Sequence, residues 1–210
     1  MARLLDPSQL SLWEAPPVAL QAPSRLEMPG AEVNYYADFL SVADAKAAFA
    51  GIRPLAPWAQ DRRIMYDRLV DVPRLSAWYG SEAAWPAVLQ ALREQVESAT
   101  GYAFDKVLLN LYRDGRDSVA WHRDDVDRFG HDEIIASVSL GATRRFMFRP
   151  RPGRPGESLA LDLPSGSLLL MGPGTQRHWE HCVPKTARDV GERINLTFRR
   201  RAGLGERPSG

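Results

Sequence analysis

The second half of the chain, after Gly101, is built from short stretches in which apolar and polar residues alternate. These stretches are KVLLNLYRDG, IIASVSLG, RRFMFRP, the two halves of SLALDLPSGSLLLMG, and RINLTFRR. Turn-forming residues such as Pro164-Ser165-Gly166 separate them, and no stretch with helical spacing intervenes. Several short strands joined by turns predict an antiparallel sandwich or roll.

The first half has a different pattern. AEVNYYADFL resembles a strand that enters a short helix near residues 41–51, and residues 54–81 are irregular, with strand candidates around Arg63–Met65 and near Trp78. A second helix is predicted before a stop at Gly101, because its apolar residues recur at helical spacing: Val88, Leu89, Leu92 and Val96. We therefore expect an α+β protein, mainly β, whose N-terminal helices buttress one sheet.

Composition narrows the class of protein. The 210 residues are 25% charged and 44% hydrophobic, which is ordinary for a globular domain. No apolar run is long enough to span a bilayer, and acid and proline interrupt the first twenty residues where a signal peptide would be apolar. The single cysteine, Cys182, excludes an intrachain disulfide and fits a reducing compartment, so we expect a cytoplasmic protein. The net charge is +1, with the positive balance in the second half, which is compatible with a polyanionic partner but does not establish one.

The segment VAWHRDDVDRF contains a candidate metal site. His122 and Asp124 are two residues apart at a strand end, so their side chains point to the same side. A third ligand must come from the other histidines, which are His131, His178 and His181. Two imidazoles and one carboxylate leave coordination positions open and suit a non-haem Fe(II) oxygenase, whereas a structural zinc site usually has thiolates. A lone His-X-Asp pattern is also common in ordinary surface or core positions.

The last strand supports the idea of a polar pocket. Arg193, Asn195 and Arg199 lie at even separations and share one face, and the apolar face carries the alternate residues Ile194, Leu196 and Phe198. Inward-facing arginines are costly unless they meet an anion, and their planar fork suits a carboxylate. The alternative is an exposed polar face on an edge strand.

Six blocks, in this order and spacing, resemble the AlkB family of Fe(II)- and 2-oxoglutarate-dependent dioxygenases. They are NLYRDG, HRD, IASVSLG, RRFMF, GSLLLMGPGTQRHWEH and RINLTFR, within residues 104–200. The resemblance implies a double-stranded β-helix, or jelly roll. We expect a loosely ordered arm over residues 1–30, packing through Leu10, Leu12 and Trp13, and one AlkB-like domain over residues 31–205. Within it, residues 31–100 would form a helical buttress and substrate lid, and residues 101–200 the jelly-roll catalytic core.

The resemblance also implies residue roles. His122, Asp124 and His181 match the iron ligands, and His178 matches a position that does not ligate. Asn110 and Tyr112 match residues that touch 2-oxoglutarate, and they too lie an even step apart. Arg199 matches the arginine that pairs with the distal carboxylate of 2-oxoglutarate, and Arg193 and Asn195 match the residues beside the co-substrate.

The activity that the resemblance implies is oxidative demethylation of N-alkylated nucleobases in DNA, such as 1-methyladenine or 3-methylcytosine. It would consume Fe(II)-activated O₂ and 2-oxoglutarate and release formaldehyde, and the base would be single-stranded or flipped. We expect a monomer that contacts phosphates through basic side chains. The candidates are Arg74, Arg149, Arg151, Arg154, Lys185 and Arg188.

Two departures from the family bear on the substrate. Repair members have an acid two residues after the ligand aspartate, where this chain has Val126 between Asp125 and Asp127. The connection from Gly80 to the helix near Trp85 is also short, which implies a reduced lid. The candidates for stacking on the base are Trp78, Tyr79 and Trp58. The alternatives are the same chemistry on an RNA modification, a protein side chain or a small molecule, or a non-catalytic binding protein on the same fold.

Overall fold

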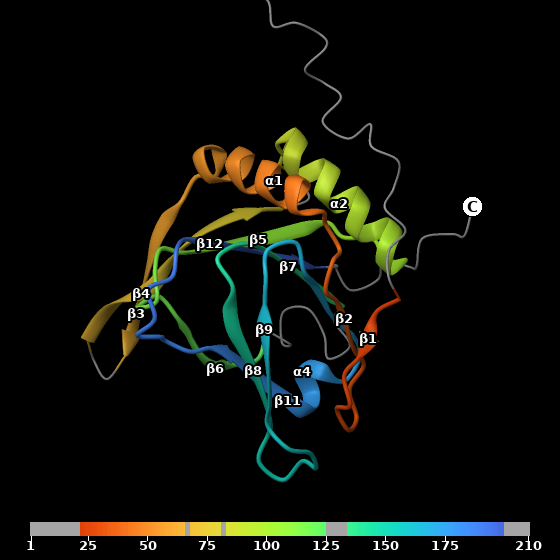
Figure 1. Ribbon diagram of the computed structural model, residues 1–210. Helices are drawn as coiled ribbons and strands as arrows, with labels where there is room; N and C mark the ends of the chain where they lie inside the picture. The colour runs from red at the N-terminus through yellow and green to blue at the C-terminus, as the bar shows by residue number, and fades with distance from the viewer. Residues whose placement is uncertain (1–21, 66–67, 81–82, 125–133, 200–210) are drawn as a thin grey trace, which may run out of the picture.

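Two antiparallel sheets face each other in the computed structural model, which describes residues 22–65, 68–80, 83–124 and 134–199 (Figure 1). The larger sheet has the strand order β1 (Ser24–Arg25), β2 (Val33–Tyr36), β10 (Leu168–Met171), β7 (Ile135–Gly141), β12 (Arg193–Arg199), β5 (Lys106–Tyr112), β4 (Arg68–Tyr79) and β3 (Ala59–Met65). The smaller has the order β6 (Val119–His122), β11 (Trp179–Val183), β8 (Arg144–Pro150) and β9 (Leu159–Leu163). The mainly β jelly roll is therefore confirmed.

Two helices cover the outer face of the larger sheet, as Figure 1 shows at its top. Helix α1 (Val42–Leu55) begins at Ser41, whose side chain accepts a hydrogen bond from the Asp44 backbone N–H at 3.1 Å. Helix α2 (Ala87–Thr100) ends at Gly101, which has the left-handed φ of 77° that glycine adopts without strain. Both predicted helices are present, and α1 runs a turn further than expected. Among the described residues, no helix has the length and apolarity needed to cross a bilayer.

The alternation along each strand divides the core into two layers. One layer lies between the helices and the larger sheet and includes Leu92 of α2 with Ile194, Leu196 and Phe198 of β12. The other lies between the sheets and is formed by residues such as Tyr112, Phe146, Phe148, Leu169 and Val183. The polar residues of β12 face this second layer, so the site described below is enclosed between the sheets.

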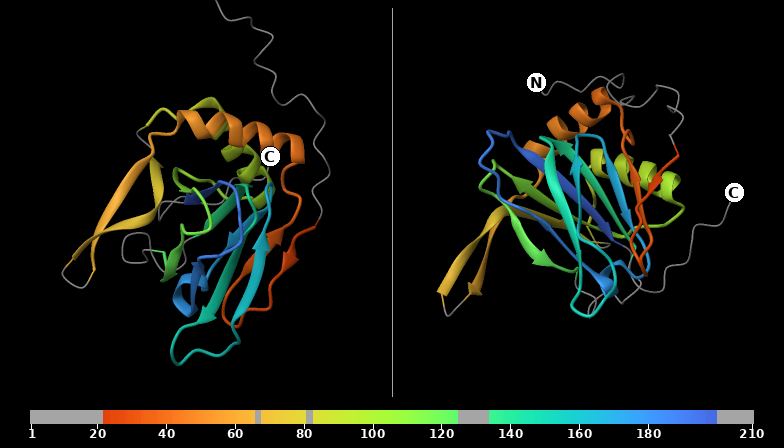
Figure 2. Two further views of the ribbon diagram at one scale, coloured as in Figure 1. Left: turned by 60° about the vertical axis from the view of Figure 1, so that its left-hand side comes forward. Right: turned by 60° about the horizontal axis from the view of Figure 1, so that its bottom comes forward.

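The segment expected to be irregular, residues 54–81, is largely a long hairpin. Strands β3 and β4 pair from Ala59↔Ser76 to Met65↔Arg68 and project from the body of the molecule (Figures 1 and 2). The base of β4 continues into the larger sheet through Leu75↔Leu111. The sequence AQDRR has charged residues on both sides of the strand, so the alternation that identifies a half-buried strand is absent.

The expected boundary at residue 30 is too late for the described part of the arm. Strand β1 pairs with β2 through Ser24↔Tyr35, and Met28 is 5% exposed in the layer between the sheets. Residues 22–30 therefore belong to the fold because the apolar Met28 is buried there. Leu10, Leu12 and Trp13 lie outside the described residues.

The region 31–100, which we expected to form a helical buttress, also supplies strands β2, β3 and β4 to the larger sheet. It is therefore not purely helical. Helix α4 (Thr175–His178) is a single turn that leads into β11.

Candidate active site

Two strands of the smaller sheet bring three ligand-type side chains together. His122 ends β6, Asp124 follows it, and His181 lies opposite His122 in the β6–β11 register. One donor atom from each residue lies within 4.8 Å of the others, and the His181 Nε2 atom is 3.6 Å from Asp124 Oδ2. The structure thus assembles His122, Asp124 and His181 into a group that could hold a metal ion. His178 lies elsewhere, with its ring packed closely against Gly30.

The protonation states of this group suit a divalent cation. Burial opposes the charge of Asp124, but the positive charge and hydrogen bond of Arg199 favour it, and the pKa of Asp124 lies below its usual value. Burial, with a contribution from His122, lowers the pKa of His181 to about 3, so its imidazole is neutral. The His122 Nδ1 atom lies 2.9 Å from the Ala120 carbonyl, which leaves Nε2 for a metal. An ionised carboxylate and neutral imidazoles are the forms that bind metal.

Two further residues fix the position of Asp124. The Asp124 backbone N–H donates to Oε1 of the buried Gln176 in α4 at 2.9 Å. The Arg199 Nη2 atom donates to Asp124 Oδ1 at 2.5 Å, across the space between the sheets. Arg199, which the resemblance assigns to the distal carboxylate of the co-substrate, contacts the carboxylate of Asp124 in this structure. No local signal in the sequence identified Gln176, because its contact joins residues 52 positions apart.

Arg193 is a second buried arginine on the same face of β12, and two of its side-chain nitrogens have no hydrogen-bond partner among the described residues. It is 1% exposed, and its Nη2 atom donates to Ser139 Oγ at 3.0 Å. Its Nε and Nη1 atoms are buried and have no hydrogen-bond partner among the described residues. Its Cζ atom lies 5.2 Å from the centre of the Tyr112 ring, so the guanidinium also contacts that ring. Unpartnered buried N–H groups on a guanidinium are costly, so this arrangement fits a bound carboxylate.

The two asparagines lie on the same polar face as Arg193. Asn195 and Asn110 are opposite each other in the β12–β5 register. The Asn195 Nδ2 atom donates to Ser137 Oγ at 2.7 Å, and Asn110 Oδ1 accepts from Arg74 Nε at 2.7 Å. The face predicted from even spacing therefore exists, and its asparagines are held by neighbouring side chains.

Strand β4 divides the candidates for substrate contact between its two faces. Ala77 is buried in the helix-side layer, and Tyr79 packs against the same layer. Tyr79 therefore points away from the site, contrary to the expectation that it could stack on a base. Trp78 is on the other face and is 44% exposed, and the centre of its ring lies 6.0 Å from the Arg199 Cζ atom. Trp58 packs on the helix-side layer and donates to the Arg53 carbonyl, so it too is outside the site.

The remaining substrate candidates have separate outcomes. Asp125 and Val126 lie outside the described residues. The connection from β4 to α2 covers only residues 80–86, so it is as short as the sequence indicated.

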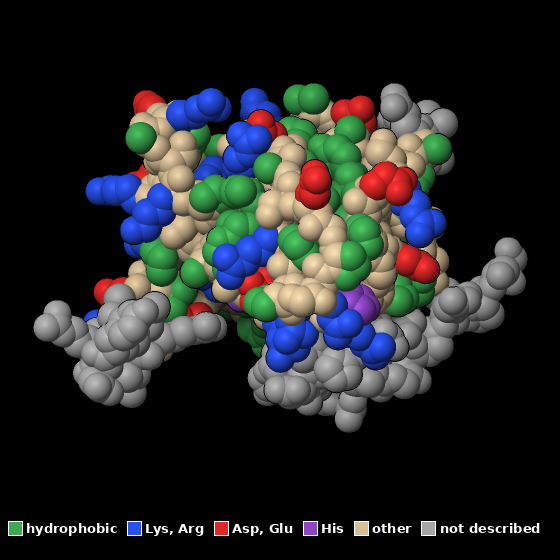
Figure 3. Space-filling model, turned by 90° about the horizontal axis from the view of Figure 1, so that it is seen from below, with side chains coloured by type: hydrophobic (Ala, Val, Ile, Leu, Met, Phe, Trp, Pro, Cys, Tyr) green, Lys and Arg blue, Asp and Glu red, His purple; other side chains and the backbone are tan. Residues whose placement is uncertain are grey.

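The basic residues expected to contact phosphates differ in whether they already have partners. Arg149 forms an ion pair with Glu180 at 2.7 Å, and Arg151 donates a hydrogen bond to the Arg177 carbonyl. Figure 3 shows Lys and Arg side chains gathered beside a histidine on the face seen from below. The other basic candidates on loops are exposed: Arg154, Lys185 and Arg188.

Comparisons with known proteins agree with this geometry. The model of the 2OG-Fe(II) oxygenase superfamily matches residues 32–199. Alpha-ketoglutarate-dependent dioxygenase alkB homolog 3 of Homo sapiens is 38% identical over 186 residues, which cover 80% of this chain and 65% of that protein. DNA oxidative demethylase ALKBH2 of Arabidopsis thaliana is 30% identical over 224 residues, covering 87% of this chain and 71% of that protein. The chain thus spans just under two thirds of its alkB homolog 3 relatives. The solved structure of OsALKBH1 shares the fold, with a TM-score of 0.58 at 16% identity over 85% of this chain and 99% of that one.

Proposed function

Because the chain belongs to the 2OG-Fe(II) oxygenase superfamily and, within it, to the AlkB family, we propose that it removes N-linked alkyl groups from nucleobases in DNA by oxidation. The observation that carries the proposal is the cluster of His122, Asp124 and His181, of which Asp124 and His181 are buried, together with the buried guanidinium of Arg193, which has unpartnered donors. The names of the relatives, which include DNA oxidative demethylase, support the choice of DNA.

His122, Asp124 and His181 would hold Fe(II), because two imidazoles and one carboxylate form the ligand set that suits that ion. Bound Fe(II), with 2-oxoglutarate and O₂, would supply the oxidation that hydroxylates the alkyl carbon, after which the product releases formaldehyde and the unmodified base. Arg199 keeps Asp124 ionised and oriented. Asp124 and His181 are buried, which would limit the access of bulk water to their side of the metal.

Arg193 and Tyr112 would receive the distal carboxylate of 2-oxoglutarate. The role proposed for Arg193 rests on its two unpartnered buried nitrogens, and Arg199 is not assigned it because Asp124 occupies its Nη2 atom. Asn110 and Asn195 would line the same pocket from adjacent strands. Asn110 is linked to strand β4 of the projecting hairpin through its hydrogen bond with Arg74.

The substrate would be an alkylated base that is single-stranded or flipped out of a duplex, because the damaged edge is otherwise paired. Trp78 is exposed beside Arg199 and offers a flat surface for stacking. Arg154, Lys185 and Arg188 are exposed and would contact phosphates in a salt-dependent way.

The test is mass spectrometry of a single-stranded DNA oligonucleotide with one 1-methyladenine, incubated with the protein, Fe(II), ascorbate, 2-oxoglutarate and O₂. Loss of the methyl group with matching succinate is expected. The variant His122→Ala should lose both products, and His178→Ala, three residues from His181 but outside the cluster, should keep both. Succinate without methyl loss would redirect the search to RNA, protein or small-molecule substrates. Absence of both products from an iron-loaded protein would overturn the proposal.

We also propose that the protein acts as a monomer in the cytoplasm. The buried, unpaired Cys182 supports a reducing compartment. Light scattering coupled to size exclusion would test the monomer, and a stable dimer at micromolar concentration would contradict it.

A further inference from the structure

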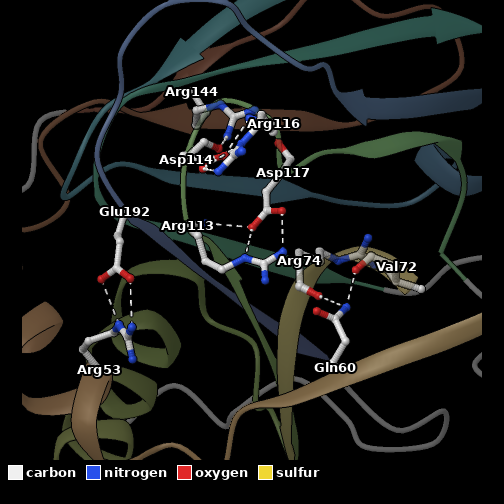
Figure 4. Close-up of polar contacts among 10 residues, drawn as sticks. All are labelled: Arg53, Gln60, Val72, Arg74, Arg113, Asp114, Arg116, Asp117, Arg144 and Glu192. Carbon is white, nitrogen blue, oxygen red and sulfur yellow. Dashed lines mark hydrogen bonds and ion pairs between the residues drawn. The ribbon is translucent and has the colours of Figure 1, made fainter. Parts of the chain in front are cut away.

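Arg144, at the start of β8, is a buried arginine to which the proposed function gives no role. It is 3% exposed. Its Nη1 atom donates to the Asp114 carbonyl at 3.0 Å, and its Nη2 atom donates to the carbonyls of Asp117 and Pro184, both at 2.8 Å. Figure 4 shows this guanidinium beside the turn that carries Asp114 and Asp117. One side chain thus joins two loops that are far apart in the sequence.

Both loops adjoin the active site. The turn of residues 113–118 connects Tyr112 at the end of β5 with β6, which ends at His122. Pro184 directly follows β11, which carries His181. The two loops also touch directly, because the Thr186 N–H donates to the Gly115 carbonyl at 2.8 Å. A Cβ on Gly115 would lie 2.4 Å from the Thr186 carbonyl oxygen, so only glycine permits this approach.

Arg144 also contacts the pocket through Tyr112. Its Cζ atom lies 5.5 Å from the centre of the Tyr112 ring, and the Arg193 Cζ atom lies 5.2 Å from the same centre. Guanidinium groups at such distances from a ring face are attracted to it. The Tyr112 ring is therefore contacted by the guanidinium groups of both Arg144 and Arg193.

The charge of Arg144 is not neutralised by its own hydrogen-bond partners. All three are carbonyl oxygens. The neighbouring carboxylates of Asp117 and Asp114 are instead bound by Arg113 and Arg116. Burial lowers the pKa of Arg144 and of Arg193, and the charge of Arg144 lowers that of Arg193 further. Two buried cations beside one tyrosine favour an anion in the adjoining pocket.

We propose that Arg144 is a positioning residue for the co-substrate, because it holds Tyr112 and the 113–118 turn so that Tyr112 and Arg193 can receive the distal carboxylate of a 2-oxo dicarboxylic acid. The inference rests on the proposed function, which supplies the co-substrate, and adds a residue that does not itself touch it. A positioning role of this kind acts on the distal carboxylate and leaves the metal-chelating end of the ligand unaffected.

The test compares two ligands by calorimetric titration into the Mn(II)-loaded protein. 2-Oxoglutarate has both the chelating end and the distal carboxylate, and oxalate has the chelating end alone. For Arg144→Gln we expect about a tenfold or greater loss of affinity for 2-oxoglutarate, with oxalate affinity within about threefold of wild type. Arg144→Lys keeps the charge but cannot span the carbonyls of both loops, so it should lose affinity for 2-oxoglutarate in the same selective way.

The matched control is Arg116→Gln, which removes a positive charge from the same turn. Arg116 has an 89% exposed side chain that pairs with Asp114, so its loss should leave both affinities within about twofold. Equal losses for both ligands in Arg144→Gln, or wild-type 2-oxoglutarate affinity in either Arg144 variant, would overturn the inference. If neither Arg144 variant folds, Tyr112→Phe must show the selective loss, and its absence would have the same meaning. If wild type binds Mn(II) but not 2-oxoglutarate, the proposed function fails instead.

Discussion

Two arginines on one face of β12 have different partners, and their substitution should have different consequences. Arg199 donates to the metal-ligand candidate Asp124, whereas Arg193 has unpartnered buried nitrogens beside Tyr112. We expect Arg193→Gln to weaken 2-oxoglutarate binding about tenfold or more with little effect on the metal, because a buried carboxylate loses its charged partner. Arg199→Gln should weaken metal binding first, because Asp124 loses the charge that keeps it ionised.

Metal and co-substrate titrations of the two variants separate these effects. Thr197→Ser, on the same face between the two arginines, is a mild control that keeps the hydroxyl and should change neither titration. The reverse pattern, in which Arg199→Gln loses 2-oxoglutarate and keeps the metal, would restore the assignment made from the sequence.

At the scale of single residues, the sequence predicted which side chains share a face but not what they bind. Arg193, Asn195 and Arg199 are an even number of residues apart, and strand geometry alone places them together. Their partners depend on tertiary contacts, since Arg199 meets Asp124 across 75 positions of sequence. The spacing therefore gives two equivalent arginines, and only the packing of the two sheets distinguishes them.

At the scale of an element, neighbouring residues of strand β4 point to opposite faces of the sheet. We therefore expect one residue to affect activity and the next to affect stability. Trp78→Ala should reduce activity on alkylated DNA and leave the free energy of unfolding nearly unchanged, because its ring is 44% exposed. Tyr79→Ala should do the opposite and lower the free energy of unfolding by about 1–2 kcal/mol, because its ring packs on the helix-side layer. Urea denaturation and demethylation rates of both variants check this, and equal activity losses would mean that β4 does not present one face to the site.

An ion pair between Arg53 and Glu192 joins helix α1 to the loop before β12. Arg53 Nε and Nη2 bind the Glu192 carboxylate, each at 2.8 Å, and the Arg53 hydrogen bonds lower the pKa of Glu192 from its ordinary 4.5 (Figure 4). A lowered pKa stabilises the fold above pH 4.5, and this contribution is lost as the pH falls through the folded-state pKa. Both side chains are over a third exposed, so screening keeps the effect of Arg53→Gln at pH 7 to about 0.5–1 kcal/mol.

Denaturation of Arg53→Gln and wild type between pH 7 and pH 3 measures this difference. The two free energies of unfolding should converge as the pH falls. Arg62→Gln, which breaks a more exposed pair with Asp71, should show almost no difference at any pH. If the difference in the free energy of unfolding between wild type and Arg53→Gln instead grew as the pH fell, the pKa of Glu192 would not be lowered in the folded protein.

The elements differ in how readily the sequence reveals them. The strands of the core and helix α2 have one buried face, so their periodicity was visible. The β3–β4 hairpin projects into solvent and has charged residues on both sides, so no periodicity marks it. Strand β1 has only two residues, both exposed, and is recognisable only through its pairing with β2.

At the scale of the whole molecule, the candidate site joins the two sheets. His122 and His181 come from the smaller sheet, and Arg193 and Tyr112 come from the larger. The sequence predicted the donor set through short motifs. It could not give the distance between the sheets, which depends on the large side chains packed between them, such as Phe146 stacked on His181 with ring centroids 5.3 Å apart.

Because the ligands bridge the sheets, metal and co-substrate should stabilise the whole fold together. A ligand that binds only the folded state at 100 times its dissociation constant adds about 2.7 kcal/mol to the free energy of unfolding. We expect Mn(II) to raise Tm, 2-oxoglutarate to raise it further when Mn(II) is present, and 2-oxoglutarate alone to have little effect, since its chelating end would then have no metal to bind. His122→Ala should lose the metal-dependent rise, and chelation with EDTA should return wild type to its metal-free Tm. If 2-oxoglutarate raised Tm as much in EDTA as in Mn(II), the co-substrate would bind without the metal. The proposed site that joins the two sheets would then be wrong.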